Sequence, residues 1–284
     1  MQSEKEYMDA ATKSSHPTFH QSMIIYLIEN ASTPTLIKLY QCNKAMKALV
    51  KKYIKTFYCD YLYIQSSDAK LEFQPLSFNE NGYIQLNVRI NDDKYFTGMK
   101  PLKVKQQLSI KLTKKSDEAA VDDLLTKVDI SEILSLYVDM TKLEKKQLLG
   151  MLNPNMEKID LDITRVGGMN CLPYFLENFP FLTELSIPWR NEKTSLTKGS
   201  KIARERKLSS LYLTNIREYI APKKLVRFVE RQMTKDAKVR FHFSWFGDLP
   251  DFYQSTMQAH LPESVSFYKW GMKTFDSDSD LSEN

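Results

Sequence analysis

Two short segments of this 284-residue chain decide its fold: residues 182–187, which read LTELSI, and residues 208–213, which read LSSLYL. Both match the pattern L-x-x-L-x-L, and they begin 26 residues apart. Side chains two residues apart point to the same face of a β-strand, so each segment predicts a strand with one apolar face.

Similar apolar strands recur on both sides of these two segments. One equivalent position from each strand gives intervals of 23, 26, 26, 28 and 26 residues: Leu136, Ile159, Leu185, Leu211, Val239 and Val265. A period in the twenties with this strand pattern is typical of leucine-rich repeats. One strand and one helix cannot bury their own apolar faces, so such units are stable only when they stack side by side in one sheet.

The stretches between these strands show helical spacing, but the repeats are irregular. The helical stretches are 141–151, 172–179, 223–234 and 251–260. Asparagine-type turn residues are few, and Asp236 and Pro262 stand where the last two repeats would begin with leucine. An ordinary alternating α/β domain therefore stays open beside the repeat interpretation. The preceding region, 57–112, is also rich in strand patterns, although it is less regular.

The N-terminal part of the chain predicts three short helices. Phe19, Met23 and Leu27 recur at helical spacing after Pro17, which suits the first turn of a helix. A second helix begins near Pro34, and a third covers 43–53. Three short helices cannot bury all of these apolar side chains, so we expect part of their surface to pack on a partner or on the next domain.

The composition excludes several classes of protein. Hydrophobic residues make up 42% and charged residues 26%, as in a folded chain, and only 8 glycines argue against phosphate-cradling loops. Three widely spaced cysteines predict no disulfide framework and a reducing compartment. The longest apolar run, 23–28, is too short to span a membrane, and the first residues resemble no signal peptide. We therefore expect a cytoplasmic or nuclear protein.

The net charge of +5 is unevenly distributed. Residues 275–284 contain Asp276, Asp278, Asp280 and Glu283 and no base, which leaves +9 on the rest of the chain. Bases recur around 44–55, 198–207 and 223–231, where we interpret them as solvated surfaces. Nucleic-acid binding is a second hypothesis, but the bases are scattered and no recognition motif accompanies them. Ser277, with Asp280 three residues later, suits an acidophilic kinase.

No motif for catalysis, for a cofactor or for a metal is apparent. Asp160 and Asp162 form a D-x-D pattern that is found in some nucleotide-binding enzymes, which makes an enzyme the third hypothesis. The solvent-facing side of a repeat strand explains the same pattern. We therefore expect a protein that is not an enzyme and that needs no cofactor.

The outward sides of the repeat strands predict a binding face for another protein. Aromatic side chains and arginine are typical of such a face. The tryptophans that follow three of the strands have a second interpretation, in which they cover the edge of the core. The predicted face consists of Tyr137, Asp160, Asp162, Glu184, Trp189, Tyr212, Arg240, His242, Trp245 and Tyr268.

Residues 16–49, HPTFHQSMIIYLIENASTPTLIKLYQCNKAMKAL, resemble the divergent F-box family that is expanded in nematodes. The later segments LPYFLENFPFLTELSI, KLSSLYLTN and FHFSWF are similar to the C-terminal half of that family. The resemblance implies that the helices bind the Skp adaptor of a cullin–RING ubiquitin ligase and that the C-terminal domain binds a protein substrate. The residues implied to face the adaptor, or to support that surface, are Pro17, Phe19, Met23, Ile24, Leu27, Leu36, Leu39 and Cys42.

The expected fold class is therefore α/β, with a three-helix F-box-like module followed by an irregular leucine-rich-repeat-like solenoid of strands and helices. The expected organisation is a disordered segment at 1–15, the helical module at 16–55, the repeat domain at 56–274 and a disordered acidic tail at 275–284. The expected partners are a Skp-type adaptor, a cullin scaffold and an unknown protein substrate. Nucleic acid is a less favoured partner, and no membrane is expected.

Overall fold

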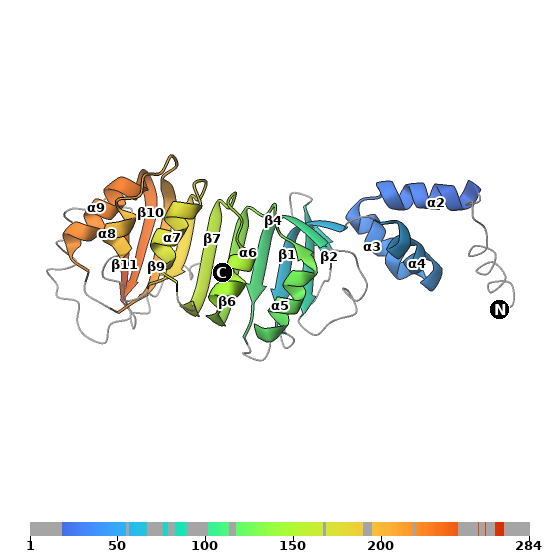
Figure 1. The fold of residues 1–284 in the computed structure, drawn as a ribbon, viewed down its shortest axis with the longest axis horizontal. Coiled ribbons are helices and arrows are strands. Elements are labelled where there is room, and N and C mark those ends of the chain that lie inside the picture. Colours follow the sequence, from blue (N-terminus) through green and yellow to red (C-terminus); the bar gives the residue numbers. More distant parts are fainter. Residues whose placement is uncertain are drawn as a thin grey trace, which may run out of the picture. The chain divides into compact units, whose positions relative to one another are not determined.

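The structure is a computed structural model that describes residues 19–54, 57–66, 76–78, 83–89, 102–113, 118–166, 169–189, 195–217, 220–243, 255, 259 and 265–269. The chain divides into two compact units, Met1–Leu134 and Ser135–Asn284. Each unit combines helices with a sheet whose strands are mostly parallel, so the expected α/β class is confirmed (Figure 1). The domain boundaries expected from the sequence stay predictions.

Three short helices open the described part of the first unit: α2 (Phe19–Asn30), α3 (Thr33–Cys42) and α4 (Lys44–Tyr53). Asn43 separates the last two helices with an extended backbone, and its side-chain oxygen accepts a hydrogen bond of 2.8 Å from the backbone N–H of Met46. That bond satisfies an otherwise unpaired donor in the first turn of α4. The helices share a small apolar core, whose fully buried members are Ile28, Leu36, Val50 and Ile54.

The sheet of the first unit has a parallel centre. Strand β1 (Phe57–Gln65) lies between β3 (Ile84–Arg89) and β4 (Leu102–Lys111), parallel to both. The short strand β2 (Leu76–Phe78) pairs antiparallel with β3, and β5 (Val128–Asp129) pairs parallel with β4. In the second half of β1 the buried Leu62 and Ile64 alternate with half-buried residues, as the period of two predicts for a strand with one covered face. An irregularity between Cys59 and Tyr61 interrupts this alternation in the first half.

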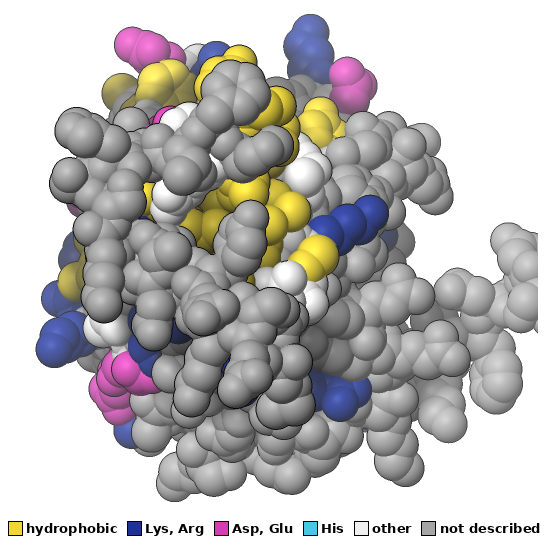
Figure 2. Space-filling model, turned by 90° about the vertical axis from the view of Figure 1, so that its right-hand side faces the viewer, with side chains coloured by type: hydrophobic (Ala, Val, Ile, Leu, Met, Phe, Trp, Pro, Cys, Tyr) yellow, Lys and Arg dark blue, Asp and Glu magenta, His cyan; other side chains and the backbone are white. Residues whose placement is uncertain are grey.

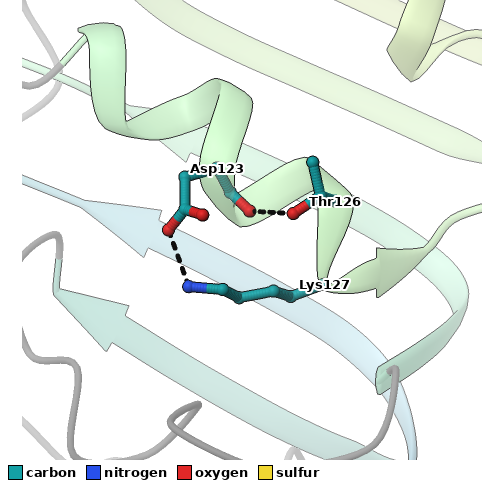
Figure 3. Close-up of polar contacts among 3 residues, drawn as sticks. All are labelled: Asp123, Thr126 and Lys127. Atoms are coloured by element: carbon teal, nitrogen blue, oxygen red, sulfur yellow. Dashed lines mark hydrogen bonds and ion pairs between the residues drawn. The ribbon is translucent and has the colours of Figure 1, made fainter.

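Local polar contacts mark the end of α5 (Glu118–Thr126), the helix that precedes β5 (Figure 3). The ammonium group of Lys127 lies 2.6 Å from a carboxylate oxygen of Asp123, and the hydroxyl of Thr126 donates to the backbone carbonyl of Asp123 at 2.6 Å. The hydroxyl of Thr126 thus satisfies a backbone carbonyl that the last turn of the helix leaves unpaired, while the ion pair joins two side chains one turn apart. The chain then enters β5, where Val128 pairs with Leu102.

The second unit alternates strands and helices around a sheet in which every described strand pairing is parallel. The helices α7, α8 and α9 lie over one face of this sheet (Figure 1). Its strands are β6 (Ser135–Leu143), β7 (Lys158–Val166), β8 (Glu184–Pro188), β9 (Leu208–Ile216), β10 (Met233–Phe243) and β11 (Val265–Lys269). Its helices are α6 (Lys145–Met151), α7 (Cys171–Asn178), α8 (Ser195–Gly199) and α9 (Pro222–Gln232).

The positions predicted to be equivalent pair with one another along the whole sheet. Each equivalent residue is the register partner of the next: Leu136 with Ile159, Ile159 with Leu185, Leu185 with Leu211, Leu211 with Val239, and Val239 with Val265. The expectation that these strands lie side by side in one sheet is therefore confirmed. Residues at the other apolar positions of the pattern, such as Leu182 and Leu208, are fully buried as well.

A hydrogen-bond pattern repeats with the same 26-residue period at the starts of the strands. The carbonyl of Glu157 accepts from the backbone N–H groups of Thr183 and Glu184, at 2.8 and 3.1 Å. The carbonyl of Thr183 accepts from the N–H groups of Ser209 and Ser210, at the same two distances. The hydroxyl groups of Thr183 and Ser209 donate to these carbonyls too. Neighbouring units are thus joined by their backbones as well as by their apolar side chains.

Long polar side chains fasten the helices of the second unit to the connections around them. The guanidinium group of Arg204 donates to the carbonyls of Leu176, at 2.9 Å, and Leu182, at 2.6 Å, and its burial lowers its pKa. The buried amide of Gln232 donates to the carbonyls of Gly199 and Ile202, both at 2.8 Å. Carbonyls in the last turn of a helix or in a connecting segment lack partners in the regular hydrogen-bond pattern, so these donors offset the cost of burying them.

The largest differences between the observed elements and the sequence expectation are in three places. Strand β10 starts at Met233, well before Val239, because α9 passes into it directly and Met233 pairs with Leu208. Helix α6 starts only at Lys145, because β6 continues to Leu143. Helix α8 was not predicted, since five residues are too few to show a period. Most of the expected helix at 251–260 lies outside the described residues.

A pair of glycine substitutions tests the packing between α7, α8 and α9. A Cβ atom on Gly199 would lie 2.9 Å from a ring carbon of Phe228 and 3.2 Å from a methyl carbon of Leu176. We expect Gly199→Ala to lower the free energy of unfolding by about 1–3 kcal/mol, as overpacking does. Chemical denaturation followed by circular dichroism measures this change.

The matched control is Gly150→Ala, because nothing lies within 4 Å of a Cβ atom at that position of α6. Alanine is the better helix former, so this variant is expected to gain up to about 1 kcal/mol. Equal stability of the two variants would contradict the packing described for Gly199.

Candidate interaction surfaces

Helix α2 exposes apolar side chains on one face while it buries others on the opposite face. Met23, Tyr26 and Leu27 are 50%, 65% and 57% exposed, and their spacing places them on the same side of the helix. Ile28, on another side, is fully buried. In the space-filling view of Figure 2, hydrophobic side chains are visible on the face that is turned toward the viewer. We call Met23, Tyr26 and Leu27 the α2 surface.

The other residues implied to contact an adaptor have different positions. Leu36 is buried and supports the helices from within, whereas Ile24 and Leu39 are half-buried and Cys42 is exposed. Phe19 is the first residue of α2, although its side chain is outside the description, and Pro17 lies outside the described residues. The structure therefore brings Met23 and Leu27 together at the surface. Tyr26 was missed, although its position three residues after Met23 was a signal for it.

The sheet of the second unit has one face whose side chains form rows across the strands. Tyr137, Asp160, Ser186, Tyr212 and Arg240 are register partners in that order, and each lies between two buried residues of its strand. A neighbouring row contains Lys158 and Glu184, whose charged groups lie 2.6 Å apart. His242 pairs with Tyr268 in a further row. We call this side of the sheet the open sheet face.

Negative charge gathers at one end of the open sheet face. Asp139 and Asp162 are direct register partners on β6 and β7, and Asp160 lies in the adjacent row. Burial raises the pKa of Asp160, and the charges of Asp162 and Asp139 raise it further, while a hydrogen bond from Ser186 opposes them. Burial, together with these three carboxylates, also raises the pKa of Tyr137.

Positive charge lies at the other end of the same face. Lys238 and Arg240 on β10 are both exposed, and Arg240 is separated from Asp160 by the strands that carry Ser186 and Tyr212. The open sheet face is thus acidic at β6 and β7 and basic at β10. A partner with an uneven charge distribution would fit this face in one direction only.

The tryptophans of the predicted binding face have a different outcome. Trp189 is only 6% exposed, and its backbone N–H donates to the carbonyl of Thr214 at 2.6 Å. It therefore covers the edge of the core instead of lying on the open sheet face, which was the second interpretation of its position. Trp245 lies outside the described residues, and the side chain of Tyr268 is outside the description too.

The cysteines do not form a reactive centre in the described part of the chain. All three are free, and Cys59 and Cys171 are buried. Burial, together with the charge of Asp60, raises the pKa of Cys59 to about 12, so its thiol stays protonated at neutral pH. Among the described residues, no group of three or more His, Cys, Asp or Glu side chains is arranged to hold a metal ion.

Two further findings concern the chain as a whole. None of the helices in the described ranges is long and apolar enough to cross a membrane. No protein-family model matches the chain, and a search of curated proteins found no match either.

Asp160→Asn tests the electrostatics of the open sheet face. The raised pKa means that the folded state holds the proton of Asp160 more tightly than the unfolded state, so this group lowers stability as the pH rises above its unfolded value. We expect Asp160→Asn to raise the free energy of unfolding at pH 7. The gain should disappear below the ordinary aspartate pKa of about 3.9, where both side chains are neutral.

Denaturant titrations at several pH values measure this gain. Asp122→Asn is the control, because Asp122 is an exposed residue of α5 in the first unit. A gain that is the same at pH 3 and at pH 7, or an equal gain in the control, would show that the charge of Asp160 does not lower the stability of the fold.

Proposed function

We propose that this protein is a substrate receptor of an SCF-type cullin–RING ubiquitin ligase. In this proposal α2–α4 are an F-box-like module that binds a Skp-type adaptor through the α2 surface. The second unit is an irregular leucine-rich-repeat-like solenoid that binds a protein substrate through the open sheet face. The protein contributes binding and position, and the ubiquitin transfer takes place on other subunits.

The observation that carries the proposal is the exposed apolar face of α2. A surface helix of a globular protein normally has a polar outer face, yet the outer face of α2 presents Met23, Tyr26 and Leu27. Burying one such side chain fully stabilises a complex by roughly 1.5–3 kcal/mol. Three such side chains on adjacent turns can therefore provide the binding energy for a helix that lies in an apolar groove of a partner.

The packing below α2 supports the same role. Ile28 is buried on the inner side, and Leu36, Val50 and Ile54 complete a core that does not include the α2 surface. A charge introduced at the exposed positions should therefore weaken binding without unfolding the helices. The resemblance of residues 16–49 to the F-box family names the adaptor that this surface would bind.

The repeating geometry of the second unit supports the role of a rigid receptor. The strands stack in register, and the backbone bonds at Glu157 and Thr183 recur with the same period. Such stacking orients one side chain per strand toward the same side, which is how repeat proteins build extended binding surfaces. Tyr137 and Tyr212 lie in the central row, among charged residues, as is usual for protein contacts.

Leu27→Asp tests the adaptor contact. Leu27 is mostly exposed, so the variant should fold, but a carboxylate in an apolar groove removes a favourable contact and adds an unpaired charge. We expect at least a tenfold loss of affinity for the Skp-type adaptor, equivalent to about 1.4 kcal/mol. Co-purification followed by calorimetry with the purified adaptor measures the loss.

Leu149→Asp is the matched control, since Leu149 is a 38% exposed leucine of α6 in the second unit. It should bind the adaptor like the unaltered protein. Failure of the unaltered protein to bind any Skp-type adaptor would overturn the ligase role. In that case other proteins captured through the open sheet face would identify a scaffold without a ligase.

A further inference from the structure

Helix α9 presents a surface made almost entirely of basic side chains. Lys223, Lys224, Arg227 and Arg231 are all exposed, and their spacing places them within about 100° of one another around the helix. The opposite side is buried by Leu225, Phe228, Val229 and Gln232. We call these four bases the α9 basic surface.

The neighbouring helix extends this surface. Arg231 donates to the carbonyl of Ser200 at 3.2 Å, so the end of α9 lies beside the end of α8. Lys198 and Lys201 are exposed at that end of α8. The ammonium group of Lys207 reaches the carbonyl of Glu230 at 2.9 Å. Glu230 is the one carboxylate on α9 itself, and its single charge does not balance these bases.

The first turn of α9 is electrostatically unfavourable as it stands. The N-terminus of a helix carries a partial positive charge that favours anions, yet Lys223 and Lys224 lie in that turn and no acidic residue does. The N-cap residue is Ala221, whose side chain cannot accept a hydrogen bond from the free N–H groups. Within the described residues, Lys223, Lys224 and Arg227 form no ion pair. An anionic segment would relieve all of these conditions together.

The sheet topology brings a suitable segment to this end of α9. Ile216, Phe243 and Lys269 are register partners on β9, β10 and β11, so the three strands reach the same edge of the sheet at these residues. Adjacent strands lie about 4.8 Å apart, which places Lys269 roughly 10 Å from Ile216. Helix α9 begins six residues after Ile216 and runs back to Met233, which pairs with Leu208 at the start of β9. Lys223 and Lys224 therefore lie toward the edge at which the chain leaves β11.

The residues that follow β11 have the complementary charge. Residues 275–284 lie outside the described part of the chain, and their sequence contains four carboxylates and no base. Asp276 follows Lys269 by seven residues, which can reach about 23 Å when they are extended. That reach is about twice the separation of roughly 10 Å between Lys269 and Ile216. A segment held on the same chain also has an effective concentration near the millimolar range.

We propose that the acidic segment 275–284 binds the α9 basic surface of the same chain. The contact consists of exposed ion pairs with Lys223, Lys224 and Arg227, aided by the positive end of α9. It is therefore weakened by salt, because exposed charges are screened within about 3 Å at 1 M ionic strength. Phosphorylation of Ser277, Ser279 or Ser282 would add negative charge and strengthen the contact.

Lysine footprinting of the full chain tests this proposal. The unaltered protein is compared with a variant that carries Asp276→Asn, Asp278→Asn, Asp280→Asn and Glu283→Gln. An amine-reactive acetylating reagent modifies exposed lysines, and mass spectrometry measures the rate at each one. We expect Lys223 and Lys224 to react at least about threefold more slowly in the unaltered protein, and we expect 1 M salt to remove the difference.

The control lysines are Lys145 and Lys146, which are exposed on α6 and should react equally in both proteins. Equal rates at Lys223 and Lys224 in the two proteins would overturn the proposal. Protection that persists in the neutralised variant would overturn it too, since another group would then cover the surface. Cross-linking with a zero-length carbodiimide provides a second measurement, in which we expect cross-links from the segment to lysines of α8 and α9. If the segment is cross-linked only to lysines elsewhere, the contact is contradicted.

Discussion

The second unit depends on apolar side chains that stack in register from one strand to the next. Ile159, Leu185 and Leu211 are successive register partners, and each is covered by its neighbours and by the helices over the sheet. A single strand with its helix would expose this row to water, so no unit is stable alone. The carbonyls of Glu157 and Thr183 add the same hydrogen bonds to successive units, which fixes their register.

Irregular repeats need further polar contacts, because their connections differ in length and expose different carbonyls. Arg204 and Gln232 provide them in the second unit. Arg204 reaches three carbonyls and Gln232 reaches two, in connecting segments or at helix ends, and neither set of contacts follows from the repeat pattern. Buried carbonyls without partners would cost roughly 1–3 kcal/mol each, so these two side chains permit departures from a regular repeat.

The remaining surfaces differ in their physical character, and that difference suggests different kinds of partner. The α2 surface is apolar and suits a lasting contact that excludes water. The open sheet face and the α9 basic surface are charged, which favours contacts that respond to salt and to phosphorylation. The receptor function proposed above would use surfaces of both kinds.

Most of the architecture could be predicted because it depends on local periods. The alternation of two within strands and the spacing near 26 residues identified Leu136 and the positions equivalent to it. Both periods can be recognised in the sequence itself, without knowledge of which elements are neighbours. Helical spacing also identified Met23 and Leu27, which the structure places together at the surface. By contrast, the sequence could not separate the exposed side of α2 from its buried side, since both are apolar. It did not show that Trp189 is buried or that Asp139 lies beside Asp162. Those facts were decided only by the tertiary structure, because burial and charge proximity depend on which strands and helices become neighbours in space.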